Sequence, residues 1–228
     1  LAYWWLNPNP PKTVTLATGP AQSAYEEFGK RYQKALAVDG IEVVLLPSEG
    51  SSHNLQLLRE GKADVAFVQG GTAELLPDDP DELVSLGNLF VEPVWLFYRT
   101  ETAQRMYNTP RLDGLRQLRG LHVNVGSQGS GVPTLMERLL EANKVERGAV
   151  KLSRLDQTPA TVDFLAGKLD ALVFASAPES LMVQMLLQTP GVQLLDFAQH
   201  EAYARRFPFL TPVTLPRGVV DLASNVPV

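Results

Sequence analysis

The chain has 228 residues, 45% hydrophobic and 20% charged, enough to bury the core of one large domain or two smaller ones. Its 20 lysines and arginines against 25 aspartates and glutamates give a net charge of −5. This argues against nucleic acid as the main partner, because phosphate binding needs a basic field. With no cysteine, the chain has no disulfide, zinc–thiolate site or cysteine nucleophile. The three histidines lack the spacing of a zinc-protease motif, and we expect neither a metal nor a cofactor.

Residues 1–11 are expected to be a membrane-proximal remnant and linker. Six apolar residues that include Trp4 and Trp5 precede a stretch rich in proline and asparagine. Six residues are too few to cross a bilayer, but adjacent tryptophans are typical of a membrane–water interface. The alternative is a hydrophobic edge strand. We expect a membrane anchor to precede Leu1, and the end at Val228, which lacks a stop signal, to be a cut as well.

The first half of the chain predicts strands that alternate with helices. Apolar residues at helical spacing indicate a helix over residues 21–38 and another from Ser52 onward. The second helix ends in Gly-Lys-x-Asp, which begins at Gly61. Glycine adopts the left-handed conformation that ends a helix, and the lysine complements the helix dipole. The predicted strands are residues 14–17, 42–46 and 65–68.

The second half repeats this order about 106 residues later. Gly167 begins a second Gly-Lys-x-Asp sequence, followed by another all-apolar strand. Thr158 is predicted as a helix N-cap with Pro159 at the first helical position, and a further helix starts near Ser180. The other predicted elements are strands 121–125, 150–155 and 171–174 and a helix over 133–143.

The two aspartates that end the repeats, Asp64 and Asp170, recur symmetrically. A structural capping role explains them better than a catalytic pair. Strands alternating with helices indicate an α/β fold, here two similar α/β lobes. The apolar residues 91–98 are predicted to cross between them as a strand. We assign residues 12–92 and 207–228 to lobe one and residues 93–206 to lobe two.

Six polar loops follow the predicted strands and form a candidate binding surface. Ligands of open α/β sheets bind beyond the carboxyl ends of the strands, where helix N-termini present free N–H groups. These loops are rich in Gly, Ser, Thr, Asn and Gln and nearly free of charge, which predicts a small anionic or zwitterionic ligand. The loop at 126–131 has neither the Lys-Ser/Thr of a P-loop nor the dinucleotide glycine pattern, so nucleotide binding is not favoured.

Two titratable residues near these loops leave alternatives open. His53 is either a ligand contact or a histidine at the rim of a helix start. Glu92, in an apolar stretch, either accepts a ligand amine or hydroxyl, or is a solvated hinge residue, because a buried carboxylate needs a partner. The serines show neither a histidine–acid pairing nor a GxSxG elbow, so no catalytic set is predicted.

Several motifs, taken in order, resemble the TAXI-type solute-binding proteins of TRAP transporters, which have the type II periplasmic-binding-protein fold. The matching segments are Thr18-Gly19 with Tyr25, and residues 48–55, 58–69, 89–94, 118–131 and 214–218. The resemblance implies a two-lobed periplasmic or extracytoplasmic receptor that closes on a small carboxylate-bearing solute and delivers it to TRAP-type permease subunits. The ligand contacts it implies are Gly19, Ser23, Ser51, Ser52, Asn54, Gln69, Glu92, Ser127, Gly129, Ser130, Gly131, Thr158 and Ser176.

The leading hypothesis is therefore a non-enzymatic, membrane-anchored solute receptor that works by hinge closure. A membrane-tethered sensor with the same fold and site is the main alternative. A small-metabolite enzyme of the same fold is a third.

Overall fold

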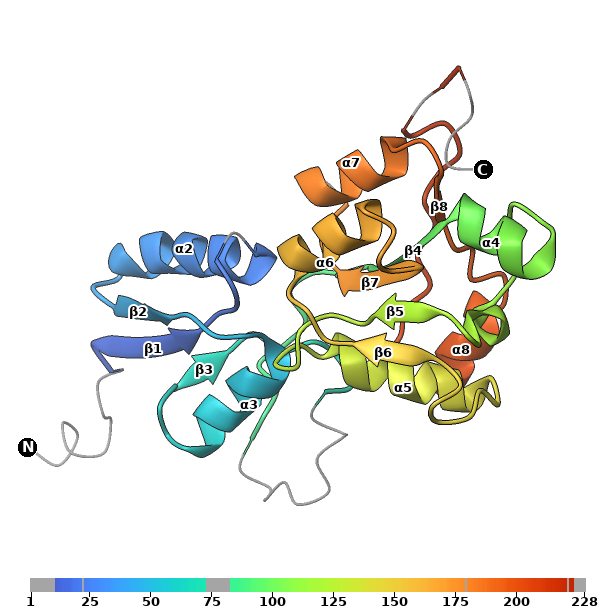
Figure 1. Ribbon diagram of the computed structural model, residues 1–228. Helices are drawn as coiled ribbons and strands as arrows, with labels where there is room; N and C mark the ends of the chain where they lie inside the picture. Colours follow the sequence, from blue (N-terminus) through green and yellow to red (C-terminus); the bar gives the residue numbers. More distant parts are fainter. Residues whose placement is uncertain (1–10, 22, 73–82, 179, 221, 224–228) are drawn as a thin grey trace, which may run out of the picture. The chain divides into compact units, whose positions relative to one another are not determined.

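The computed structural model describes residues 11–21, 23–72, 83–178, 180–220 and 222–223 (Figure 1). The chain forms two compact units, Leu1–Val68 (unit 1) and Gln69–Val228 (unit 2). The predicted membrane-proximal remnant, except for Pro11, lies outside the described residues. In the part of the chain that is described, no helix combines the length and the apolar character needed to cross a bilayer.

Unit 1 contains a three-stranded parallel sheet in the order β2-β1-β3. Its small core joins Ala17 of β1 to Leu57 and Ala63. Gly29 lets a helix lie close to the sheet, because a β-carbon there would be 2.8 Å from Thr18 Cγ2 and 3.1 Å from Leu45 Cδ2. The elements are β1 (Thr13–Ala17), α2 (Ala24–Ala37), β2 (Glu42–Leu46), α3 (Ser51–Arg59) and β3 (Val65–Ala66).

Unit 2 contains a five-stranded mixed sheet in the order β6-β5-β7-β4-β8, in which β4 runs antiparallel to both of its neighbours. The strands are β4 (Val94–Arg99), β5 (His122–Asn124), β6 (Lys151–Ser153), β7 (Ala171–Ala175) and β8 (Val192–Leu194). The helices are α4 (Thr100–Tyr107), the 3-10 helix η2 (Leu115–Leu118), α5 (Val132–Ala142), α6 (Gln157–Leu165), α7 (Leu181–Gln188) and α8 (His200–Arg206).

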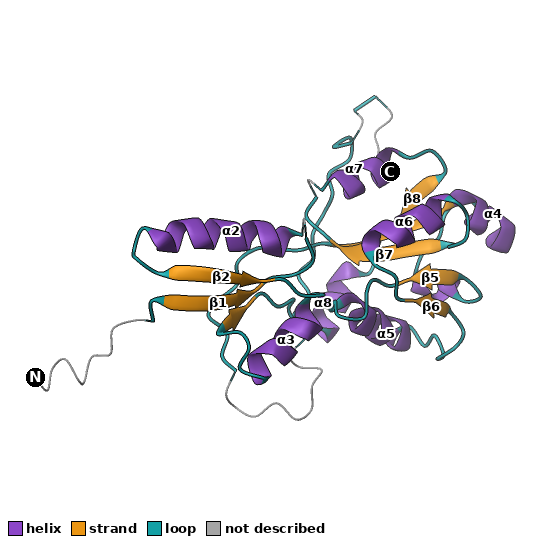
Figure 2. Cartoon of the chain, turned by 60° about the vertical axis from the view of Figure 1, so that its left-hand side comes forward, coloured by secondary structure: helices purple, strands orange, loops and turns teal. Residues whose placement is uncertain are grey.

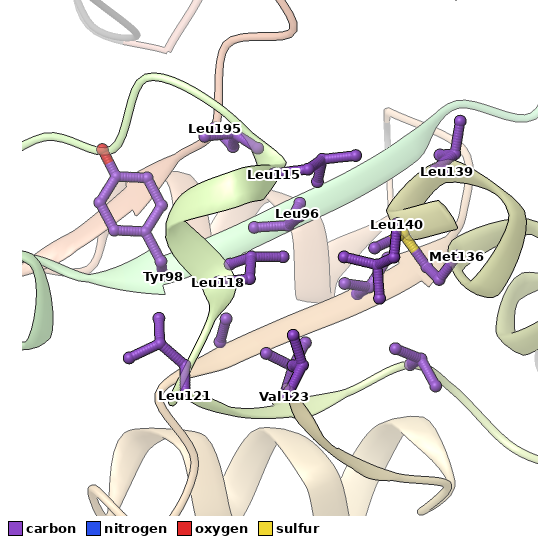
Figure 3. Packing of buried hydrophobic residues seen from close by; sticks show 14 of the residues in the cluster. Leu96, Tyr98, Leu115, Leu118, Leu121, Val123, Met136, Leu139, Leu140 and Leu195 are labelled. Atoms are coloured by element: carbon purple, nitrogen blue, oxygen red, sulfur yellow. The ribbon is translucent and has the colours of Figure 1, made fainter. Parts of the chain in front are cut away.

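Helices cover both faces of the unit 2 sheet, which explains why residues 94–98 of β4 and all of β7 are apolar (Figure 2). Side chains alternate along a strand, so Leu96 and Tyr98 face one core and Trp95 and Phe97 the other. The first core includes residues of η2 and α5 (Figure 3). The second includes residues of α6 and α7. Trp95, Phe97 and Tyr98 are thus core residues.

The predicted repeat is present in the structure. Strands β2-β1-β3 and β6-β5-β7 have the same order and are all parallel. Gly61 and Gly167 both have left-handed φ angles, 64° and 79°. These features confirm the α/β fold with two similar halves.

Both aspartates of the repeat have a structural role, which is to bridge neighbouring strands. Asp64 donates its N–H to Thr15 O (2.9 Å) and accepts the Thr15 N–H on Oδ2 (2.7 Å). Asp170 donates to His122 O (2.8 Å) and accepts the His122 N–H on Oδ2 (2.8 Å). Asp64 therefore links the start of β3 to the middle of β1, and Asp170 links the start of β7 to the start of β5.

The predicted start of α6 is wrong. The helix begins at Gln157 with Asp156 as its N-cap, so Thr158 and Pro159 lie inside the first turn. Proline is tolerated there because the first four N–H groups of a helix have no intrahelical acceptor. The predicted helix start near Ser180 is confirmed: α7 begins at Leu181, and Ser180 is its N-cap, with a side chain that accepts the Val183 N–H (3.4 Å).

The compact units differ from the predicted lobes in two segments, because residues 69–92 and 207–228 fall in unit 2. Phe207 is buried in the first core of unit 2, and Leu215 packs against the second. The predicted crossing strand corresponds to β4, which lies within the unit 2 sheet. The lobe boundaries themselves stay a prediction.

Candidate functional site

The polar loops lie at the carboxyl edges of the two sheets. Because β1, β2 and β3 are parallel, the segments after them emerge at one edge of the unit 1 sheet. The same holds for the segments after β5, β6 and β7 in unit 2. The helices α3, α5 and α6 start at these edges, and none has a side-chain N-cap hydrogen bond among the described residues. The first turns of these three helices therefore lack the N-cap side-chain acceptor that commonly binds an N-terminal N–H group.

Asn54 organises the edge of unit 1. It is fully buried, and its Nδ2 donates to Thr18 O (2.5 Å) and Phe67 O (2.7 Å), the carbonyls that follow β1 and β3. Ser48 Oγ also donates to Thr18 O (3.4 Å). Asn54 Oδ1 has no hydrogen-bond partner in the described part of the chain, so this buried acceptor remains available to a donor.

The other predicted contacts of unit 1 have local structural partners. Ser23 caps α2, because its Oγ accepts the Glu26 N–H (3.2 Å). Ser51 is buried at the first position of α3, with its Oγ 3.4 Å from Tyr25 Oη. Gly19 is buried beside this group, and Ser52 is partly exposed in α3.

His53 takes part in the loop before α3. Its Nδ1 accepts the Glu49 N–H at 3.2 Å, which closes the loop over the first turn of the helix. This geometry agrees with the histidine at a helix start. A contact of His53 with a ligand stays a prediction.

The 126–131 loop of unit 2 forms a compact turn at the start of α5. Ser130 donates from both N and Oγ to Ser127 O, at 3.1 Å and 2.9 Å. Gly126 has a φ of 86°, and a β-carbon there would lie 3.2 Å from Ser130 Oγ. Gly129 and Gly131 are buried, whereas Ser127 and Ser130 are partly exposed. The loop thus presents hydroxyls and backbone groups with no charge.

Asn124 holds the next loop in place. It is fully buried at the end of β5, and its Oδ1 accepts the Leu155 N–H (2.8 Å) and Ser153 Oγ–H (3.2 Å). Its Nδ2 donates to Leu155 O at 3.1 Å. This fixes the chain between β6 and α6, just before the first turn of α6, in which Thr158 is exposed. Sequence reasoning missed Asn124, although an asparagine within an apolar strand was a usable signal.

Glu92 and Ser176 lie at the same edge because β4 and β7 are antiparallel. Ser176 N donates to Pro93 O (3.2 Å), and the Trp95 indole N–H donates to Ser176 O (2.9 Å). Both Glu92 and Ser176 are partly exposed. A carboxylate therefore lies beside the neutral hydroxyls of this edge.

Gln69 lies over the start of α5. A β-carbon built on Gly131, the N-cap of α5, would be 2.5 Å from Gln69 Oε1 and 2.8 Å from Thr72 Oγ1. The structure thus brings five predicted contacts to the edge of unit 1 and eight to that of unit 2. The contacts of unit 1 are Gly19, Ser23, Ser51, Ser52 and Asn54. Those of unit 2 are Gln69, Glu92, Ser127, Gly129, Ser130, Gly131, Thr158 and Ser176.

The edges present groups suited to hydrogen bonding. No group of three His, Asp or Glu side chains in the described residues could hold a metal ion. Hydrogen bonds from Lys62 and Gln56 lower the pKa of Glu60, which lies just beyond α3. Such an arrangement suits recognition of a polar solute.

Residues 16–227 match the NMT1-like family. The chain belongs to this family. A search of curated proteins finds no match.

Several solved structures are similar to this chain, and they have the fold of type II periplasmic binding proteins. The alkanesulfonate-binding protein SsuA from Xanthomonas axonopodis pv. citri, bound to MOPS, is 16% identical with a TM-score of 0.57, covering 89% of this chain and 70% of that one. SsuA from Escherichia coli is 18% identical, with a TM-score of 0.54, and the match covers 86% and 64%. The GluR0 ligand-binding core from Nostoc punctiforme, in complex with L-glutamate, is 16% identical, with a TM-score of 0.54, and the match covers 82% and 79%.

Proposed function

We propose that the chain is an extracytoplasmic receptor for a small carboxylate-bearing or zwitterionic solute, which the carboxyl-edge loops of the sheets bind. The observation that carries the proposal is the duplication. Two sets of three parallel strands, in the same order, each end in loops that carry few charges, and three of the helices that follow them, α3, α5 and α6, start without a side-chain cap. Such helix ends stabilise a ligand anion through N–H groups and the helix dipole.

The ligands bound in similar structures support this ligand class. They are MOPS, L-glutamate and, in a periplasmic binding protein from Brucella ovis, glutathione. Each of these is a small molecule with anionic groups. In the present chain, Glu92 would accept a hydrogen bond from an amine or hydroxyl of the solute. The N-termini of the helices and the serine and threonine hydroxyls would bind the anionic group of the solute.

Delivery to a TRAP-type permease, with attachment to the membrane ahead of Leu1, is the finer form of the proposal. Its support is the resemblance to TAXI-type proteins at motifs such as Ser48-Glu49-Gly50-Ser51. A tethered sensor remains the second candidate, because the same fold occurs in the regulatory domain of CcmR from Synechocystis. Neighbouring permease genes would favour transport, and a signalling domain in the full-length product would favour sensing.

A thermal-shift screen tests the receptor proposal. The panel contains amino acids, dicarboxylates and alkanesulfonates, each with wild-type protein. A ligand at 100 times its Kd stabilises the folded state by about 2.7 kcal/mol, which raises Tm by roughly 5–10 °C at 2–4 °C per kcal/mol. If no compound raises Tm, the receptor proposal fails.

Matched variants locate the site. Glu92→Gln should lose most of the shift for an amine-bearing ligand. Glu146→Gln, an exposed glutamate before β6, should keep it. Turnover assays of the wild type, Glu92→Gln and His53→Ala would test the enzyme hypothesis, which measurable turnover by the wild type would revive.

A further inference from the structure

Residues 69–72 form a tight turn at the beginning of unit 2. Thr72 N donates to Gln69 O at 3.2 Å, and Gly71, the third residue, has a φ of 83°. A positive φ at this position is what a type II β-turn requires, and glycine supplies it without strain. Thr72 is buried and Gln69 is partly exposed. We call this segment the 69–72 turn.

The side chains at the two ends of the 69–72 turn lie on one glycine. A β-carbon on Gly131 would be 2.5 Å from Gln69 Oε1 and 2.8 Å from Thr72 Oγ1, both closer than non-bonded atoms approach. The missing β-carbon of Gly131 is therefore the space that these two oxygens use. They lie at the N-cap of α5, which has no side-chain cap of its own.

An aromatic ring lies on the middle of the 69–72 turn. A β-carbon on Gly71 would be 2.5–2.7 Å from three ring carbons of Phe209, so the ring packs directly against the glycine. Phe209 packs in turn against the first core of unit 2, and its ring centroid is 5.9 Å from that of Phe207. The core thus supports the ring, and the ring supports the turn.

We propose that Phe209 and Gly131 are positioning residues of the ligand site: together they clamp the 69–72 turn and hold Gln69 at the start of α5. The inference rests on the proposed function, because Gln69 is a predicted ligand contact. It extends the site to Phe209, which packs against Gly71 of this turn. A β-carbon on Gly71 would displace the Phe209 ring or the turn, and one on Gly131 would displace Gln69 and Thr72.

Hydrogen–deuterium exchange of the ligand-free protein tests the clamp. Phe209→Ala removes the ring from Gly71 and should speed the exchange of the amides of residues 70–72 by about tenfold. Leu210→Ala is the matched control, because Leu210 is the next residue, is also partly buried, and packs against the same core. Phe209→Leu is a milder variant that preserves folding and should give an intermediate increase.

The clamp is supported if exchange rises in Phe209→Ala and not in Leu210→Ala. It is overturned if exchange at residues 70–72 stays at the wild-type rate, or if both variants raise it equally, which would indicate general loosening of the core. This decision requires no ligand. A screen without any stabilising compound would therefore remove the proposed function, while the clamp would still be decided.

Binding measurements test the positioning role. L-glutamate is the first probe, and the most stabilising compound of the screen is the second. Phe209→Ala and Gly131→Ala should each weaken binding about tenfold. They should cause no further loss in a Gln69→Ala background, since they act through Gln69. The role would be overturned if the losses of affinity added to that of Gln69→Ala. It would also be overturned if the controls Leu210→Ala and Gly114→Ala lost as much affinity. Gly114→Ala is a control because no atom lies within 4 Å of the β-carbon that it would gain.

Discussion

Removing the two repeat aspartates should have unequal effects, although the sequence presents them as equivalent. Asp64 is exposed, and its carboxylate accepts the Thr15 N–H. The carboxylate of Asp170 accepts the His122 N–H (2.8 Å), the Thr102 hydroxyl (2.9 Å) and Arg105 Nη2 (3.0 Å). Its side chain is only 20% exposed.

The magnitudes follow from these contacts. A hydrogen bond to a charged group contributes about 1.5–3 kcal/mol, and solvent reduces this for an exposed acceptor, so Asp64→Ala should cost about 1–1.5 kcal/mol. Asp170→Ala removes the hydrogen bonds from the His122 N–H and the Thr102 hydroxyl, both at a mostly buried site. The ion pair with Arg105 adds little, because this arginine is largely exposed. Its cost should be about 3–4 kcal/mol.

The assay must separate the two units, because a chain of two compact units need not unfold in one step. Hydrogen exchange in mild urea measures the stability of each unit separately: the amides of β1 report the effect of Asp64→Ala, and those of β5 report the effect of Asp170→Ala. Asp163→Ala is the control, since Asp163 forms a surface pair with Lys168 and should cost below about 0.5 kcal/mol. Equal losses for both repeat aspartates, or losses no larger than that of Asp163→Ala, would refute the reasoning.

Three further changes should destabilise the fold. Gly29→Ala places a β-carbon 2.8 Å from Thr18 Cγ2, so the thermal stability of unit 1 should fall by about 1–3 kcal/mol. Asn124→Ala leaves Leu155 N–H and O without their partner, and exchange of the loop before α6 should report a loss of about 2–4 kcal/mol. Burial raises the pKa of the Tyr98 phenol above its ordinary 10.0, so the folded state keeps this proton longer than the unfolded chain; urea titrations should show stability present below pH 10 and lost as pH rises through the folded pKa.

Each of these has a control. Gly114→Ala adds a β-carbon in open space and should leave stability unchanged. Ser153→Ala removes only one of the hydrogen bonds of Asn124, and a loss as large as that of Asn124→Ala would contradict the role given to the asparagine. Tyr98→Phe cannot ionise, so an equal fall of stability above pH 10 in this variant would assign the effect to another group.

Much of the fold was predictable because its signals are local. The Gly-Lys-x-Asp sequence at Gly61 and Gly167 encodes a helix end, a left-handed residue and a strand start within four positions. The start of α6 was mispredicted for the opposite reason. Thr158 and Pro159 are acceptable both as a cap and as first-turn residues, and the strand–loop geometry set by Asn124 and Leu155 accompanies a start at Gln157.

The candidate site was predictable as a set of loops, but not in its internal contacts. Parallel strands place the ends of β5 and β6 at one edge whatever their side chains, so Ser127 and Thr158 could be grouped from the order of elements. The support of the 126–131 loop and its neighbours depends on buried polar groups. The sequence does not distinguish Asn54, with its unpaired Oδ1, from any other helix asparagine.

By itself, the sequence determined the alternation of strands and helices, the duplication, and the polar character of the loops, because periodicity, glycine conformation and capping act over a few residues. Only the tertiary structure decided that the segment around Phe209 packs with unit 2, that its ring rests on Gly71, and that Gly131 provides space for Gln69. These contacts join residues far apart in the chain. Their existence depends on which surfaces are left to be buried once the sheet and its helices have formed.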